Sequence, residues 1–152
     1  MQPRNPNYKE AAAAIFRDAR FVVDVGIEPV EIAVGRVESR LVVQPRHLQH
    51  DRIIHAGVQG TMADHTSGAA AYTVIGEDQI VLTVNFLLNL LQAAIGDELR
   101  CRARVLKAGR RMVVSESEVF TRAGDRETLV AKATVTLATL DKQPRAEPPG
   151  SA

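Results

Sequence analysis

All four histidines of the chain fall within one 19-residue window, which runs from His47 to His65. The window begins within a polar stretch at 45–52 and continues into small and apolar residues that include the carboxylate of Asp64. Imidazole and carboxylate groups are the side chains that most often move protons in enzymes. We therefore look for a functional site in this window, where the residue types are compatible with three interpretations.

The first interpretation is a site for hydrolysis of an activated acyl group. Small residues at 57–74 predict a buried helix, and this helix would begin at His55, Ala56 and Gly57. The first amides of a helix lack internal partners and can hold a carbonyl oxygen that gains negative charge. Asp64 lies too far along the helix to cap it, and apolar surroundings would raise its basicity. Alternatively, Asp64 lies on a solvent-exposed edge or pairs with an arginine.

The second interpretation is a metal site. Its ligands would be the imidazoles and carboxylates of the window, His50, Asp51, His55, Asp64 and His65. No pair among them has the H-E-x-x-H spacing, and a single cysteine, Cys101, excludes a cysteine-based zinc site. The neighbours Asp64 and His65 would point about 100° apart on a helix. We therefore expect no bound metal.

The third interpretation gives the histidines no chemistry and places them in a surface loop, which suits His47 and His50 better than His55. A serine nucleophile is also conceivable, since Ser67 closely follows a histidine and an aspartate. However, nearly consecutive residues spread around a helix axis, and the sequence contains no G-x-S-x-G turn. We therefore exclude a serine hydrolase.

The periodicity of the rest of the chain predicts the elements that position this window. From Asn7 to about Asp24, apolar residues at helical spacing predict an amphipathic helix capped by Asn7. Alternating apolar and polar residues predict strands at 30–43, 80–88, 98–106, 112–120 and 128–140. Short loops join the last three, which favours an antiparallel meander. We predict an α+β fold in which a curved antiparallel sheet of about five strands wraps around the buried helix.

Length and composition limit the remaining possibilities. The 152 residues fit one domain, which we place at 8–140 between disordered tails at 1–7 and 141–152. A net charge of +1 and six aromatic residues argue against nucleic-acid binding. The sequence shows no apolar segment of the kind found in signal peptides or membrane spans, and it has one cysteine, so we expect a cytoplasmic protein.

Several short motifs occur in a characteristic order. They are His55-Ala56-Gly57, Asp64 nine residues after the histidine, Val84-Asn85-Phe86-Leu87, Gly96-Asp97-Glu98-Leu99 and Gly109-Arg110. Together they resemble the PaaI-like branch of the hotdog-fold acyl-CoA thioesterases, over about residues 34–140. The resemblance implies the hotdog fold, in which an antiparallel sheet wraps around a central helix.

The resemblance also implies roles for individual residues. Asp64 would act as general base on water, or as nucleophile, against a thioester carbonyl held by the amides of Ala56 and Gly57. His55 matches the family histidine at the helix start, and Gln49, six residues earlier, would orient the carbonyl or the water. The other implied site residues are Ser67 near the carboxylate and, for substrate binding, Asn85, Phe86, Arg110 and Arg111. Arg100, Arg102 and Arg104 are further basic candidates for the phosphates of coenzyme A, although a solvated strand face and a polar turn would explain all five arginines equally well.

The same resemblance implies a homodimer or homotetramer with the active site at the subunit interface. Coenzyme A would enter as part of the substrate, and no other cofactor is expected. A hotdog protein that binds acyl-CoA without turnover, as a sensor or carrier, is the alternative. A pure binding protein has no reason to bury a carboxylate near an acyl carbonyl, so Asp64 favours the hydrolase.

Overall fold

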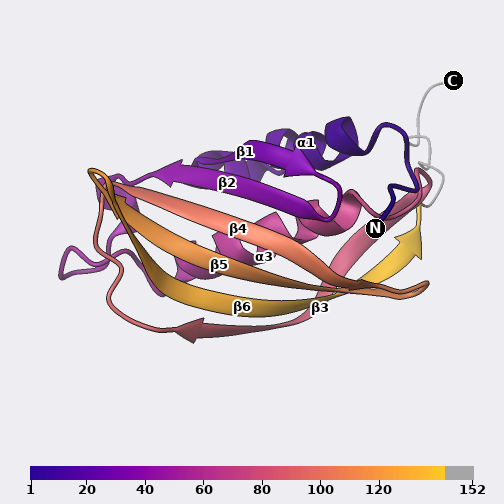
Figure 1. Ribbon diagram of the computed structural model, residues 1–152. Coiled ribbons are helices and arrows are strands. Elements are labelled where there is room, and N and C mark those ends of the chain that lie inside the picture. Colours follow the sequence, from indigo (N-terminus) through magenta and orange to yellow (C-terminus); the bar gives the residue numbers. More distant parts are fainter. Residues whose placement is uncertain (143–152) are drawn as a thin grey trace, which may run out of the picture.

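The computed structural model describes residues 1–142. Six strands form one antiparallel sheet in the order β1-β2-β4-β5-β6-β3, and this sheet curves around the central helix α3 (Figure 1). In chain order the elements are α1 (Tyr8–Asp18), α2 (Arg20–Val25), β1 (Ile27–Ala33), β2 (Arg36–Val42), the 3-10 helix η1 (Pro45–His47), α3 (Ala56–Tyr72), β3 (Gln79–Leu90), β4 (Glu98–Ala108), β5 (Met112–Ala123) and β6 (Arg126–Asp141). The predicted α+β fold, a curved antiparallel sheet around a buried helix, is confirmed.

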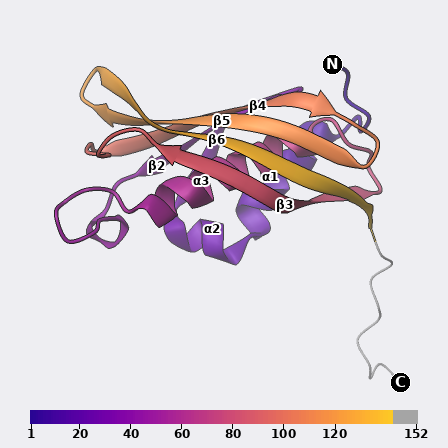
Figure 2. The same cartoon turned by 90° about the horizontal axis from the view of Figure 1, so that it is seen from below.

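All three α-helices lie on the same side of the sheet (Figure 2). The antiparallel pairs β4–β5 and β5–β6 confirm the predicted meander. No helix within residues 1–142 is both long and apolar enough to cross a membrane. Of the predicted C-terminal tail, residues 143–152 lie outside the described part of the chain. Residues 1–7 include the buried Asn5, and their predicted disorder stays a prediction.

Helix α3 lies close to the sheet because small groups face each other across the interface. The hydroxyl groups of Ser39 in β2 and Thr66 in α3 are hydrogen-bonded at 2.6 Å. Ser117 in β5 donates to the carbonyl oxygen of Ala63 at 3.2 Å. The helix residues buried by this packing are Gln59, Gly60, Met62, Ala63, Thr66, Ser67, Gly68, Ala69, Ala70 and Ala71. The predicted buried helix is therefore present, and its path along the sheet is fixed by contacts on several strands.

The stretch predicted as one strand at 30–43 instead contains the end of β1, a turn and β2, and the resulting β1–β2 hairpin makes the sheet six-stranded. Gly35 occupies the turn with φ +71°, a conformation that glycine adopts without strain. Its N–H donates to the Thr73 hydroxyl at 2.7 Å. The alternation of apolar residues continues through Val34, and for this reason the period-two pattern hides the turn.

The predicted N-terminal helix is two helices, separated at Ala19, which has extended backbone angles. Phe16 and Val22 are both buried, although six residues along one continuous helix would turn their side chains about 120° apart. The break therefore allows both to reach the core. Asn7 makes no side-chain capping bond, contrary to prediction, and its N–H instead donates to Asn5 Oδ1 at 2.8 Å.

His65 connects α3 to α1. Its ring meets the Phe16 ring edge-on, with centroids 4.7 Å apart and an interplanar angle of 84°. Its Nε2 is buried without a hydrogen-bond partner among residues 1–142. Burial lowers the pKa of His65 to about 4, and a hydrogen bond to the Ile15 carbonyl opposes this only in part. The imidazole is therefore neutral in the folded protein at neutral pH.

Stability is expected to fall as the pH drops below about 6.5. The unfolded chain then binds a proton at His65 that the folded chain does not bind until about pH 4. The free energy of unfolding is expected to be lower at pH 5 than at pH 7.5 by on the order of 2 kcal/mol. Urea unfolding of the parent and of His65→Leu at both pH values measures it. Equal losses in the two proteins would contradict this role for His65.

Candidate active site

The first turn of α3 presents one free amide. His55 is the N-cap, and its Nδ1 accepts a hydrogen bond from the Gly57 N–H at 2.9 Å. The Gly57 amide, which was expected to face the substrate, is thus already occupied. The Ala56 N–H has no acceptor among residues 1–142. An oxyanion at this helix start would therefore bind to Ala56, with the positive end of the helix dipole behind it.

Asp64 lies two turns further along α3, half-buried against β3. Thr83 donates its hydroxyl hydrogen to Asp64 Oδ1 at 2.7 Å. Burial raises the pKa of Asp64 above its ordinary value, and the Thr83 hydrogen bond opposes this rise. No ion pair within residues 1–142 involves Asp64. Asp64 is thus neither paired with an arginine nor fully solvated, and its carboxylate is a stronger base than an ordinary aspartate.

Within one chain, the free amide and the carboxylate are too far apart to act on the same carbonyl group. Ala56 and Asp64 are eight residues apart, which separates them by about 12 Å along the helix axis. A carboxylate that activates water must lie within one water molecule of the reacting carbon. The free amide therefore lies at the start of α3 and the carboxylate near its middle, and the two cannot act together within a single chain.

A hollow of about 320 Å³ lies between the start of α3 and the end of β3, and we call it the β3 hollow. Gln49 lines it together with Ala56, and the Gln49 backbone is held by a 2.8 Å bond from its N–H to the Ile53 carbonyl. Gln59 also lines it. Its Nε2 donates to the Ile54 carbonyl at 3.1 Å, while its Oε1 is buried without a partner among residues 1–142. The β3 hollow thus combines amide side chains with the free helix amide.

The hydroxyl group beside Asp64 belongs to Thr83 and not to Ser67. Ser67 is fully buried, and its hydroxyl makes no hydrogen bond within residues 1–142. It points about 60° away from Asp64 around α3, which directs it into the helix–sheet interface. Thr83 was missed because it lies 19 residues away on another element. The available signal was a lone hydroxyl between the apolar residues Leu82 and Val84.

The two predicted substrate residues of β3 face opposite sides of the sheet. Phe86 pairs with the buried Val135, and its ring lies beside Gly60 of α3, where an added Cβ would be 3.8 Å away. Asn85 pairs with Thr136 on the outer face. Phe86 therefore adjoins the helix face near the free amide, whereas Asn85 does not reach it within one chain.

The predicted phosphate ligands Arg110 and Arg111 lie in the turn between β4 and β5. The helix start is joined to the other end of β4, because Ile54 N–H donates to Ala94 at 2.9 Å. The 11 residues of β4 span about 35 Å. Arg110 and Arg111 are thus remote from the helix start of their own chain.

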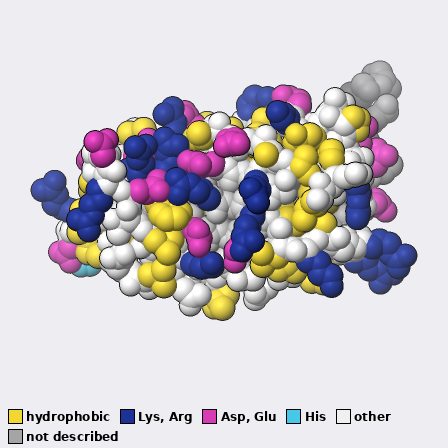
Figure 3. All heavy atoms as spheres, viewed as in Figure 1, with side chains coloured by type: hydrophobic (Ala, Val, Ile, Leu, Met, Phe, Trp, Pro, Cys, Tyr) yellow, Lys and Arg dark blue, Asp and Glu magenta, His cyan; other side chains and the backbone are white. Residues whose placement is uncertain are grey.

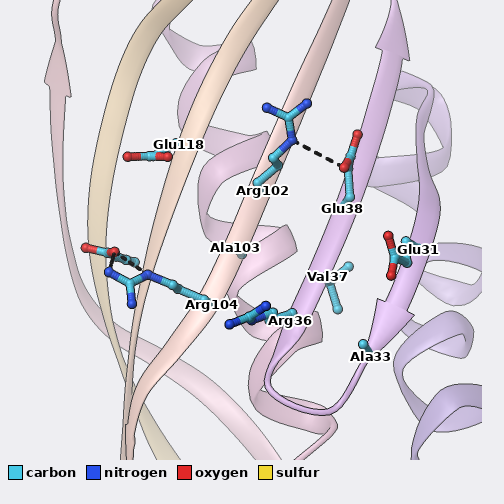
Figure 4. Close-up of a pocket in the computed structure, with 10 residues that line it drawn as sticks. Glu31, Ala33, Arg36, Val37, Glu38, Arg102, Ala103, Arg104 and Glu118 are labelled. Atoms are coloured by element: carbon cyan, nitrogen blue, oxygen red, sulfur yellow. Dashed lines mark hydrogen bonds and ion pairs between the residues drawn. The ribbon is translucent and has the colours of Figure 1, made fainter.

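The other basic candidates, Arg100, Arg102 and Arg104, lie on the outer face of the sheet and are paired with carboxylates. Figure 3 shows acidic and basic side chains intermixed on this face. In the groove over β1, β2, β4 and β5, Arg102 binds Glu38 (Figure 4) and Arg104 binds Glu116. These ion pairs account for the alternation in β4 and leave the three arginines away from α3.

The four histidines have separate environments. His47 is buried, which rules out for it the surface-loop interpretation, and His50 is exposed beside Asp51. His55 caps α3 and His65 packs on α1. Within residues 1–142, no group of three His, Cys, Asp or Glu side chains is arranged to hold a metal ion. Burial also raises the pKa of the Cys101 thiol to about 12, so a cysteine nucleophile is excluded.

Strand β3 has a free edge. It pairs with β6 on one side and with no strand of residues 1–142 on the other. Its large apolar side chains are unusually exposed, at 44–62%, and they are Leu82, Val84, Phe86, Leu87 and Leu90. A long apolar edge strand is a template for pairing with another strand. This edge runs beside the face of α3 that carries Asp64.

Known proteins resemble this chain in sequence and in fold. The thioesterase superfamily profile matches residues 52–136, which include the start of α3, Asp64 and β3. A Caenorhabditis elegans protein named as an esterase is 33% identical over 121 residues, 78% of this chain and 69% of its own. A thioesterase family protein from Silicibacter pomeroyi has a TM-score of 0.86 at 29% identity, covering 88% of this chain and 98% of its own. The Escherichia coli PaaI protein, at 17% identity, shares the fold with a TM-score of 0.80 over 90% of this chain and 95% of its own.

Proposed function

The chain belongs to the thioesterase superfamily and is a thioester hydrolase, and on this premise we propose that it hydrolyses acyl thioesters of coenzyme A with Asp64 as general base. The observation that carries the proposal is the half-buried Asp64 carboxylate, which has a raised pKa and a fixed hydrogen bond from Thr83. A protein that only binds its ligand gains nothing from such a base.

In the proposed reaction, Asp64 takes a proton from a water molecule as the water oxygen attacks the thioester carbon. The carbonyl oxygen becomes negative and is held by the Ala56 N–H. The carbon–sulfur bond then breaks, and the thiolate of coenzyme A leaves and takes the proton from Asp64. Gln49, in the β3 hollow, orients the carbonyl group. The steps require no metal, and coenzyme A enters only as part of the substrate.

The separation of about 12 Å between Ala56 and Asp64 along α3 leads us to propose that a second copy completes the site. Pairing of two β3 edges about a two-fold axis would place the two α3 helices side by side and antiparallel. Asp64 of one protomer would then face Ala56 of its partner. The same operation brings the β4–β5 turn of the partner toward this helix start, so Arg110 and Arg111 would bind coenzyme A phosphates across the interface.

The particle in solution is expected to be at least a dimer. A twofold pairing along β3 covers its exposed leucines, which removes apolar surface from water. Light scattering at micromolar concentration should give at least twice the chain mass of 16.5 kDa. A Leu87→Lys change puts a charge on this edge and should favour the single chain. A parent mass of 16.5 kDa would refute the shared site.

Replacing Thr83 by valine is expected to lower kcat/KM by about three- to tenfold, the value of one hydrogen bond. The Thr83 hydrogen bond lowers the pKa of Asp64, so its loss raises that pKa further and moves the acid limb of the pH–rate profile to higher pH. Thr83→Ser keeps the hydroxyl and should restore both values. An unshifted acid limb in the valine variant would show that Thr83 does not act through Asp64.

The proposed function is tested with a panel of acyl-CoA substrates that vary in chain length and aromaticity, read by the release of free thiol. We expect turnover of at least one member, with no effect of a metal chelator. Acyl-CoA binding without thiol release would reassign the protein as a sensor or carrier.

A further inference from the structure

A second hollow lies beside the first turns of α3, and no residue of β3 lines it. It measures about 440 Å³ and is enclosed by α2, the segment at 46–48 and α3, and we call it the α2 groove. Its apolar lining consists of Phe21, Val25, Leu48 and Val58. Its polar lining consists of Asp24, Arg46, His47, His55 and Thr61, with Gly57 at the helix start. The residues at the start of α3 thus border two hollows of different character.

The wall formed by α2 is fixed by a buried histidine. His47 Nδ1 accepts a hydrogen bond from the Gln44 N–H at 3.0 Å, so its proton is on Nε2, which donates to the Val25 carbonyl at 2.8 Å. Gly26 ends α2 with φ +91° and directs the chain into β1. These contacts hold the C-terminal end of α2 against η1, and the groove is therefore a built feature of the fold.

The α2 groove borders the face of α3 on which Asp64 also lies, although Asp64 does not line the groove. Gly57, Thr61 and Asp64 follow one another at intervals of four and three residues, so they lie on one face of α3. Gly57 and Thr61 line the groove. Across from them, the Phe21 side chain is 65% exposed, although large apolar groups at a surface are costly. A ligand that reaches the helix start can therefore cover Phe21.

We propose that the α2 groove binds the acyl group of the thioester, that this group is an uncharged aromatic or medium-length chain, and that Phe21 sets its size. The proposal rests on the proposed function and specifies its substrate. A thioester carbonyl carries two substituents, the pantetheine chain and the acyl group. The pantetheine chain contains amides, which can hydrogen-bond to Gln49 and Gln59 in the β3 hollow. The acyl group would then lie in the α2 groove, against its four apolar side chains. Pockets of about 300 Å³ and above are large enough to bury such groups.

The test compares acyl-CoA substrates from acetyl to dodecanoyl, together with phenylacetyl-CoA. Phe21→Ala should lower kcat/KM for the preferred acyl group by about tenfold, and the loss should grow with acyl size. Val58→Phe narrows the groove and should shift the preference to shorter chains. Val23→Ala is the matched control, because Val23 is on the same helix, is 52% exposed and lines a different hollow. It should leave the profile unchanged.

The outcomes separate this inference from the function on which it rests. If the parent releases no thiol from any acyl-CoA, the proposed function fails. If the parent is active but Phe21→Ala lowers all substrates equally, or changes no more than Val23→Ala, the α2 groove does not hold the acyl group. A change of particle mass in Phe21→Ala would make Phe21 an interface residue and would also overturn the proposal. Because Phe21 is exposed, its variant should fold even if Val58→Phe does not.

Discussion

Replacing Asp64 by asparagine is expected to lower turnover of the best thioester by about 10²- to 10⁴-fold, the usual worth of a general base. Asparagine has nearly the same shape, and its Oδ1 can still accept the hydrogen bond from Thr83. It cannot take a proton from water. Substrate affinity should change little, because the substitution removes the proton acceptor but does not remove a contact with the substrate.

The fold of this variant should be retained, since an amide is cheaper to bury than an unpaired carboxylate. Circular dichroism and thermal melting check this, and Asp125→Asn, an exposed change in the turn before β6, is the matched control. The parent should lose activity as the pH falls through the raised pKa of Asp64, because the protonated carboxyl is no base. A folded Asp64→Asn variant that matched the parent in rate would make Asp64 structural.

The start of α3 and its carboxylate could be predicted because both depend on neighbours along the chain. The small residues that follow Gly57 predict burial, and burial raises the pKa of Asp64 in the predicted direction. The alternation of apolar and polar residues likewise predicted which face of β4 is solvent-exposed and which is buried. The β1–β2 turn was missed because Val34 continues the apolar alternation into the turn, and the only local signal is Gly35.

The remaining site features depend on contacts between distant segments, which local patterns do not encode. Thr83 reaches Asp64 only after β3 pairs with β6 in the observed register. His47 is buried because its ring binds a carbonyl 22 residues earlier. Arg102 in β4 forms an ion pair with Glu38, which lies 64 residues earlier in the chain. The strand face that looks basic in the sequence therefore has its positive charge paired with a carboxylate. Residue types therefore indicate a candidate site, while contacts between distant segments determine which side chains lie together there.

Replacing Ala56 by proline is expected to lower kcat by about 10²- to 10³-fold, the cost of losing one oxyanion donor. Ala56 is the first residue of α3, where proline is favoured because that N–H has no helical partner. His55 already has φ −60° and ψ 139°, which suits a residue before proline. The change thus removes the free amide hydrogen and keeps the helix. Ala56→Ser, which keeps the N–H, should retain activity, and equal losses in both variants would assign the effect to side-chain bulk.

Mixing the two inactive variants then tests whether the site is shared between protomers. In a dimer of one Asp64→Asn chain and one Ala56→Pro chain, a shared site pairs the intact Asp64 of the second chain with the intact Ala56 of the first. The other site of that dimer contains both substitutions, Asp64→Asn and Ala56→Pro. Random reassociation after unfolding makes half of the dimers mixed, so about a quarter of the parental activity should return. If the site were contained within one chain, every chain would carry one lesion. The mixture would then stay inactive, and such a result would refute the shared site while leaving the roles of both residues intact.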